Sequence, residues 1–239
     1  MRLTRASKLP LHDVVTELRD RSVNYDESEV RAPTWHFDHH RFVLGTDPPG
    51  RPAEGSVWWR ACREVAAYAF TPPGLLRAHY LRDDPLVGRN LLLVGRFALA
   101  RFAMGVRITE AGSGEDGERC SWGWGYETLQ GHLERGRVDY RVVKDLRTGV
   151  VTLEVDSHHQ VNPRAHPVLR LGWALFGRRA QRRFYSAAGE NLRRLAHQPE
   201  VTGPDDEELV EVPRGIARRG EPFWAIAVLD GANDPGRGA

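Results

Sequence analysis

Two ionisable residues, His132 and Glu134, lie two positions apart at the start of a segment that alternates like a β-strand, His132–Asp145. Residues two apart in a strand share a face, and a rise of about 3.3 Å per residue puts these two roughly 7 Å apart. A histidine and a carboxylate at this spacing could bind the polar group of a ligand or act as an acid–base pair. A structural alternative stays open, in which Glu134 pairs with an arginine or both side chains lie at the solvated strand end.

The alternation within this segment predicts which way the pair points. The odd-numbered positions are mostly charged and are expected to face water: Arg135, Arg137, Asp139, Arg141 and Asp145. The even-numbered positions are apolar at their centre, at Val138, Tyr140 and Val142. Glu134 is therefore expected on the inner face, where a carboxylate needs a partner or a raised pKa. Arg101, in an otherwise apolar strand, is a candidate partner.

Two histidine doublets, His39–His40 and His158–His159, raise the question of a metal site. Adjacent strand residues point to opposite faces, so neither doublet can chelate an ion by itself. A site would need one histidine from each doublet and a carboxylate such as Asp156. We therefore expect no metal. No P-loop, no GxGxxG after a strand and no GxSxG elbow is present, so no cofactor is predicted either.

Composition limits the class of protein. The 239 residues are 41% hydrophobic and 28% charged, which is typical of a globular chain. Arginine greatly outnumbers lysine, as GC-rich coding produces, but 32 acidic residues leave a net charge of only +2, which argues against a nucleic-acid partner. Cys62 and Cys120 form no CxxC pair, which favours a reducing compartment. With no signal peptide or membrane-spanning run, the expected location is the cytoplasm.

The chain divides into elements by its apolar periodicity. Leu11–Leu18 has helical spacing, Thr34–Gly45 reads as a strand with Trp35, Phe37 and Val43 on one face, and Trp58–Phe70 reads as a helix. Short turn sequences then separate consecutive strands: Leu75–Leu81, Asn90–Ala100, Arg101–Ala111, Glu118–Leu129, His132–Asp145 and Val150–Val161. Because no βαβ rhythm occurs, an antiparallel sheet is predicted.

A long helix is expected from Pro167 to about His197. Its apolar stripe includes Trp173 and Phe176, and its opposite face carries six arginines: Arg178, Arg179, Arg182, Arg183, Arg193 and Arg194. That arginine face is expected to be solvated or covered by the acidic tail. Phosphate, anionic lipid or a partner protein are alternative occupants.

This order of elements predicts an α+β helix-grip fold, in which a bent antiparallel sheet wraps around one long C-terminal helix and leaves a cavity. Residues 1–33 form an N-terminal extension, 34–198 the domain and 199–239 an acidic tail. The apolar run Phe223–Leu229 is expected to dock onto the domain, with an edge strand as one form of docking, because seven apolar residues in a row avoid water. Gly231–Ala239 is expected to stay mobile.

Three stretches also carry a family resemblance: Phe70–Phe97, Trp124–Lys144 and Asn162–Phe184. The runs Tyr126–Gly136 and Gly177–Phe184 are the most specific. Over roughly Thr34–Ala196 the chain resembles the uncharacterised domain-of-unknown-function 1990 family of bacteria and plants. That family is grouped with the START and Bet-v-1-like helix-grip superfamily, whose members mostly bind apolar or amphipathic small molecules in the cavity.

The resemblance implies that the chain binds such a molecule between the sheet and the long helix. The expected ligand-binding residues are Glu134, His132, Tyr126, Trp124, Tyr140, Arg101, Trp173 and Phe176. Two alternatives from other classes remain. One is an enzyme that uses the same cavity with Glu134 and His132 as acid and base, and the other is a scaffold or regulatory protein that binds through the arginine face.

Overall fold

The computed structural model describes residues 2–5, 10–72, 74–97, 100–163, 167–198, 207–213 and 226–229. Side chains are described for 10–72, 74–95, 102–163, 181–198 and 207–213.

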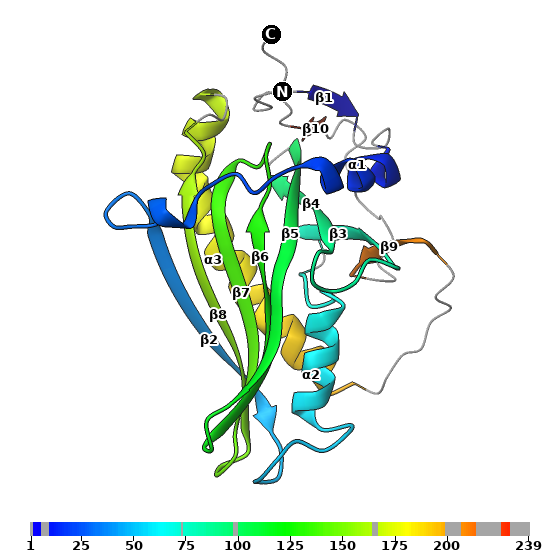
Figure 1. Cartoon of the computed structure of the whole chain (residues 1–239), viewed down its shortest axis with the longest axis vertical. Helices are drawn as coiled ribbons and strands as arrows, with labels where there is room; N and C mark the ends of the chain where they lie inside the picture. Colours follow the sequence, from blue (N-terminus) through cyan, green and yellow to red (C-terminus); the bar gives the residue numbers. More distant parts are fainter. Residues whose placement is uncertain are drawn as a thin grey trace.

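One sheet of ten strands dominates the structure (Figure 1). Its main path runs β2-β8-β7-β6-β5-β4-β3-β9, with every neighbouring pair antiparallel. The strands in that order are β2 (His36–Thr46), β8 (Val150–Val161), β7 (Glu134–Asp145), β6 (Arg119–Thr128), β5 (Ala100–Glu115), β4 (Asn90–Phe97), β3 (Leu76–Leu81) and β9 (Leu209–Val212). The predicted α+β class with a large antiparallel sheet is confirmed.

Strands from both ends of the chain join this sheet. β10 (Ile226–Leu229) pairs in parallel with β5 and antiparallel with β1 (Arg2–Arg5). The last four residues of the apolar run Phe223–Leu229 therefore lie in the sheet. Gly231–Ala239, expected to stay mobile, lies outside the described residues.

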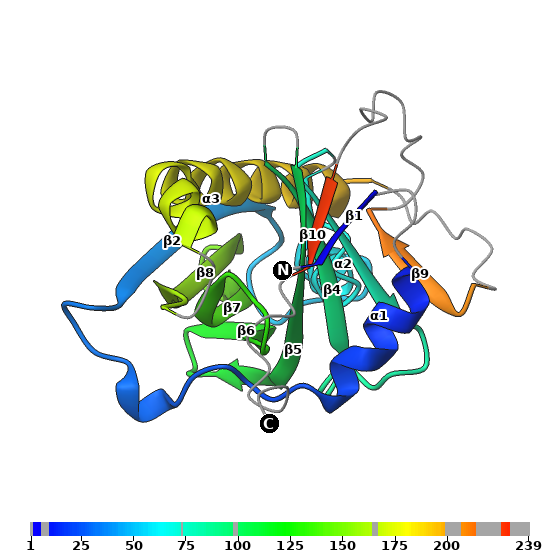
Figure 2. The same cartoon turned by 90° about the horizontal axis from the view of Figure 1, so that it is seen from above.

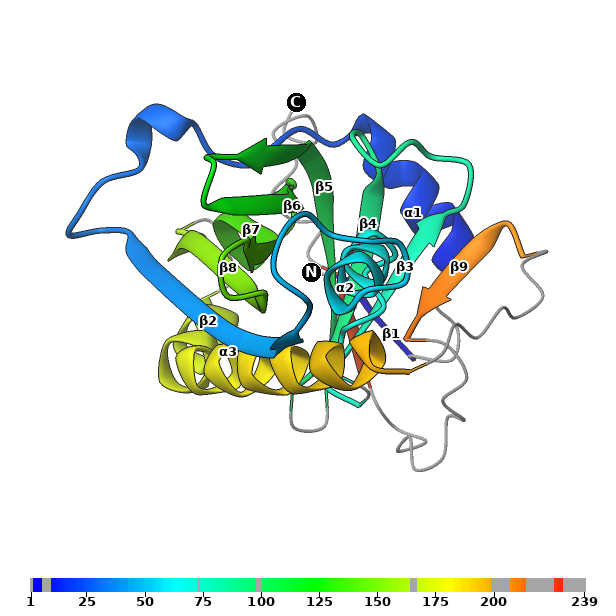
Figure 3. The ribbon, with the colours of Figure 1, turned by 90° about the horizontal axis from the view of Figure 1, so that it is seen from below.

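Helices in the described part of the chain pack on both faces of the sheet: α1 (Leu11–Glu17), α2 (Val57–Ala66) and α3 (Pro167–Ala196). α2 and α3 lie on the inner side of the curved sheet (Figure 3), and they share one hydrophobic core with β6, β7 and β8. α1 lies on the outer side over β3 and β4 (Figure 2), where a second, smaller core forms around Leu18 and Leu92. Two short 3₁₀ turns, η2 (Leu18–Asp20) and η3 (Glu27–Glu29), follow α1.

Helix α2 begins and ends through specific contacts. The carboxylate of Asp47 accepts the N–H groups of Val57 and Trp58 at 2.8 and 3.1 Å, which satisfies two free donors of the first turn. The helix ends at Ala66, four residues before the predicted Phe70. It stops there because Tyr68 adopts a left-handed backbone with φ of 55°.

In β2, the apolar positions of the sequence alternation do not lie on the face of the strand that packs inward. Phe37 and Val43 are 58% and 61% exposed on the outer face, while Leu44 is 1% exposed on the inner face. α3 decides this orientation, because it approaches so closely that a Cβ on Gly189 would lie 2.5 Å from the ring of Phe42. Phe37 and Val43 thus share a face of β2, as the alternation predicted, but that face is exposed. Trp35, predicted on the same face, lies just before the strand and is 3% exposed.

No helix in the described part of the chain is long and apolar enough to cross a membrane.

Candidate functional site

The inner face of β6 and β7 carries a layer of aromatic side chains opposite α2 and α3. Trp124 and Tyr126 come from β6, Tyr140 from β7, Tyr185 from α3 and Tyr68 from the turn after α2. All five are less than 10% exposed. The even-numbered face of β7, predicted to point inward, thus supplies Tyr140 to the interior.

The rings of this layer contact one another edge to face. The centroid of Tyr140 lies 5.0 Å from Phe70, 5.3 Å from Trp124 and 6.0 Å from Tyr68. The indole N–H of Trp124 donates to the carbonyl of Val65 at 2.8 Å, so α2 fixes this ring. Tilted and edge-to-face packing of this kind stabilises a core beyond its apolar area.

Two hydroxyl groups inside the layer make no hydrogen bond of normal geometry with a described residue, although they lie close enough to each other to influence each other's pKa. They belong to Tyr68 and Tyr140, whose side chains are 1% and 0% exposed. A buried polar group left without a partner costs about 1–3 kcal/mol. Burial also raises the pKa of Tyr126 and Tyr140 well above the usual value of 10, so both phenols are neutral at physiological pH. The layer therefore combines an apolar surface with neutral hydroxyls that can donate or accept.

Tyr68 was missed by the sequence reasoning, and its backbone is unusual. The N–H of Tyr68 bonds to Val65 O and that of Ala69 to Glu64 O, which is the Schellman arrangement that closes a helix. The left-handed position in this motif normally holds glycine, because a side chain there costs about 1–2 kcal/mol. Here it holds a tyrosine whose ring enters the aromatic layer. Strained non-glycine residues of this kind cluster at ligand sites.

Glu134, at the start of β7, is 9% exposed and bonds across to α3. The side-chain N–H of Gln181 reaches both carboxylate oxygens, at 3.1 and 3.2 Å. The charge of Glu134 adds to the effect of burial in raising the pKa of Tyr126 and Tyr185. Glu134 thus lies at the edge of the aromatic layer. Gln181 is, after Tyr68, a second site residue that the sequence did not reveal.

His132 is buried next to Glu134 but contacts its main chain. The Glu134 N–H donates to Nδ1 of His132 at 3.0 Å, and Asn162 donates to the His132 carbonyl at 3.0 Å. Burial lowers the pKa of His132 to about 4, so the ring is neutral at physiological pH. The neutral ring accepts the main-chain N–H of Glu134 and so positions the backbone of that residue. The described hydrogen bonds of the ring are to the main chain of Glu134, not to its carboxylate.

Three expected site residues have side chains outside the described set. Arg101 lies in β5, and Trp173 and Phe176 lie in the first half of α3. Pairing of Arg101 with Glu134 stays a prediction.

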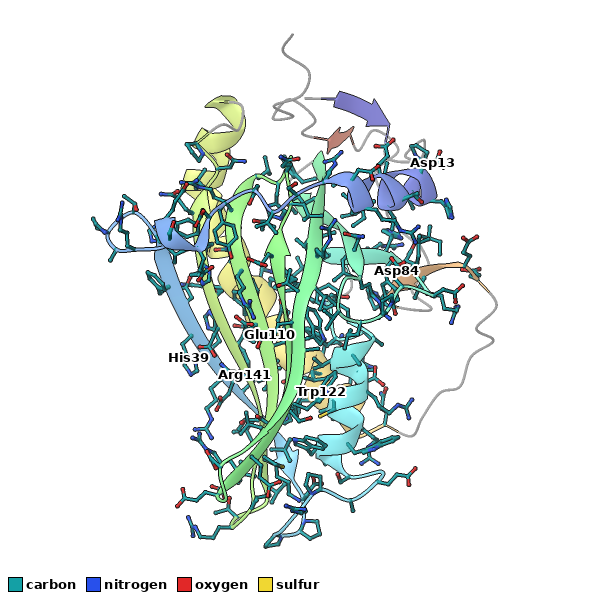
Figure 4. The ribbon with its side chains drawn as sticks, in the orientation of Figure 1. Asp13, His39, Asp84, Glu110, Trp122 and Arg141 are labelled. Carbon is teal, nitrogen blue, oxygen red and sulfur yellow. The ribbon has the colours of Figure 1, made fainter. Side chains whose placement is uncertain are left out.

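The histidine doublets are divided between the two faces of the sheet. On the outer face, His39 and Arg141 both contact the carboxylate of Asp156, at 2.7 and 2.9 Å; Figure 4 labels both residues. His159, 7% exposed, lies 3.8 Å from Asp38. Within the described ranges, no three histidine, cysteine, aspartate or glutamate side chains gather closely enough to hold a metal ion.

The aromatic layer and Glu134 lie within the part of the chain that matches a known family. The model of the domain of unknown function DUF1990 matches residues 23–191. The chain belongs to this family. The match begins eleven residues before Thr34, the start of the resemblance in the sequence, and it includes Tyr25 and Trp35. No curated protein matches the chain.

Several solved structures have a distantly similar fold. Norcoclaurine synthase from Thalictrum flavum, in complex with dopamine and hydroxybenzaldehyde, is 12% identical with a TM-score of 0.42, over 70% of this chain and 90% of that one. Major latex-like protein 151 from Panax ginseng is 10% identical with a TM-score of 0.41, over 70% and 100%. The Zhui aromatase/cyclase from a Streptomyces species is 13% identical with a TM-score of 0.40, over 67% and 96%. Similarities at this level say nothing about a ligand of this chain.

Proposed function

We propose that the protein binds an apolar or amphipathic small molecule between the inner face of the sheet and α3, in a helix-grip arrangement. The observation that carries the proposal is the pair of hydroxyls, on Tyr68 and Tyr140, that make no hydrogen bond of normal geometry among the described residues, although they lie close to each other in the aromatic layer. Buried polar groups in native proteins nearly always have a partner. Two such hydroxyls close together, with Tyr68 on a strained backbone, are what we expect of a site in which a ligand oxygen supplies the missing hydrogen bonds.

The chemistry of the layer favours a ligand whose polar group is uncharged. The rings provide apolar contact, and the neutral phenols of Tyr68 and Tyr140 can donate to a carbonyl or hydroxyl oxygen. Glu134 can accept a hydrogen bond from a ligand hydroxyl, while its charge disfavours an anionic group nearby. We infer a ligand with a rigid apolar body and one or two neutral oxygens.

The remaining predicted residues take supporting roles in this proposal. His132 holds the N–H of Glu134, and Asn24 donates to the Glu134 carbonyl at 3.0 Å, so two side chains fix the strand end that carries the carboxylate. Trp124 and Tyr126 form the sheet wall. Arg101, Trp173 and Phe176 would extend the wall along β5 and the first half of α3.

A test uses protein purified from its own host and examined by native mass spectrometry, together with titration of Nile red, a neutral apolar dye with a carbonyl acceptor. Tyr140→Phe should weaken dye binding about tenfold and remove any co-purified molecule, because one hydrogen bond of about 1–1.5 kcal/mol is lost. Tyr25→Phe is the matched control, since Tyr25 bonds to Glu127 away from the layer. Equal dye affinity for the wild type and Tyr140→Phe would contradict the proposal.

A further inference from the structure

A groove lies on the outside of the protein, between the loop that follows α2 and the second half of α3. The groove has a volume of about 590 Å³, within the range of small-molecule sites. It is lined by Pro72, Gly74, Leu75, Arg183, Ala187, Glu190, Asn191 and Arg194.

The groove carries an excess of positive charge. Among the described residues, neither Arg183 nor Arg194 has a carboxylate partner. The acidic residue of the groove, Glu190, is occupied by Arg193, which lies outside the lining and contacts both its carboxylate oxygens, at 2.6 and 3.1 Å. Within the described part of the chain, no carboxylate therefore competes with an incoming anion for these two guanidinium groups.

One of these guanidinium groups is held in place by the fold. Arg194 donates to the side-chain oxygen of Asn191 at 2.7 Å. Asn191, itself 9% exposed, donates from its amide nitrogen to the carbonyls of Phe70 and Thr71 at 3.1 and 3.2 Å. The chain of bonds ties Arg194 to the main chain of the loop. This contact uses one of the five N–H donors of the guanidinium. Two parallel donors remain for a bidentate contact with a planar anion.

Apolar side chains also line the groove. Pro72 and Leu75 come from the loop, and Ala187 lies on α3 between Arg183 and Arg194. Eleven helical positions separate the two arginines, a distance of about 16 Å along the axis. An extended hydrocarbon chain of about a dozen carbons has a similar length, so the apolar part of such a molecule could lie along this surface.

We propose that this groove binds an amphipathic anion, with its carboxylate or phosphate on Arg194 and its apolar part on Pro72, Leu75 and Ala187. The site is separate from the interior site proposed above, which favours neutral oxygens. The anion is taken from solution as a free molecule, because the groove is concave and holds one chain.

The experiment titrates the protein with decanoate and decyl phosphate below their micelle concentrations. NMR signals of the Asn191 side-chain amide and the Gly74 main-chain amide report on the groove itself. Both probes should shift these signals, whereas 1-decanol, which has the same chain and no charge, should bind at least tenfold more weakly. Arg194→Gln should reduce the affinity for decanoate about tenfold or more, since a hydrogen bond to a charged group is lost.

Control variants distinguish binding in the groove from binding in the interior and from general attraction to the positive charge of α3. Arg182→Gln removes the same charge from an exposed position on α3 outside the groove and should change the affinity less than twofold. Tyr140→Phe should leave binding in the groove unchanged. The groove and the interior site can therefore be tested independently of each other. Equal binding of decanol, unchanged affinity in Arg194→Gln, or Arg194-dependent recruitment only to phosphatidylglycerol vesicles would each overturn the proposal.

Discussion

Replacing Tyr140 by phenylalanine tests the central feature of the interior site. In most proteins the loss of a buried tyrosine hydroxyl costs about 1 kcal/mol, because a hydrogen bond is broken. The Tyr140 hydroxyl makes no hydrogen bond of normal geometry with a described residue, and the side chain is 0% exposed. Its removal eliminates an uncompensated desolvation cost of about 1–3 kcal/mol and leaves only a small void. The free energy of unfolding of the ligand-free protein should therefore rise, by about 1 kcal/mol.

The assay is urea unfolding of protein that has first been unfolded and refolded to remove any bound molecule. In a parallel thermal melt, 1 kcal/mol corresponds to a Tm increase of about 2–4 °C for a chain of this length. Tyr25→Phe is the control, because the Tyr25 hydroxyl donates to the Glu127 carboxylate at 2.8 Å. That variant should lose about 1.5 kcal/mol.

A clear result would refute the reasoning. If Tyr140→Phe lowers the free energy of unfolding by about 1 kcal/mol or more, in the manner of Tyr25→Phe, the hydroxyl has a partner in solution, such as a buried water. A rise in stability together with weaker ligand binding would identify Tyr140 as a residue kept for binding at the expense of stability.

Three further changes test other parts of the structure. Burial lowers the pKa of His132 to about 4, so between about pH 6.5 and 4 the unfolded chain binds a proton that the folded protein does not. The free energy of unfolding should therefore fall by about 3 kcal/mol as the pH drops through that window. His132→Asn keeps a hydrogen-bond acceptor but does not titrate, so urea titrations of this variant should not show the loss. Gly189→Ala would put a Cβ 2.5 Å from the ring of Phe42 and should lower the free energy of unfolding by about 1–3 kcal/mol in thermal melts. Glu134→Gln should leave Tm within about 2 °C and abolish ligand retention in native mass spectrometry; a parallel fall in both would mark a purely structural carboxylate.

Much of the sheet could be predicted from the sequence because strand signals are local. Alternation of apolar residues and short turn sequences determine where a strand begins and ends, and β3 to β8 start and end within a few residues of the predicted ranges. The same alternation predicted that Tyr140 points inward with the even-numbered face of β7. Family membership also follows from contiguous runs of residues, so it too was accessible without coordinates.

The contacts that make up the site were decided only by tertiary structure. Tyr68 enters the aromatic layer because a left-handed turn ends α2 early, and Gln181 meets Glu134 because α3 crosses the start of β7. Neither partner is encoded by spacing along the chain, since 47 residues separate Gln181 from Glu134.

The same distinction explains the orientation of β2 and the position of the outer groove. Phe37 and Val43 form an apolar alternation, yet they face outward because α3 packs against Phe42 on the other side. A strand pattern shows that two faces differ, but which face is buried depends on where a distant helix lies. Likewise, the sequence contained the arginines of α3, but only the loop carbonyls that hold Asn191 decided that Arg194 would be fixed beside a groove.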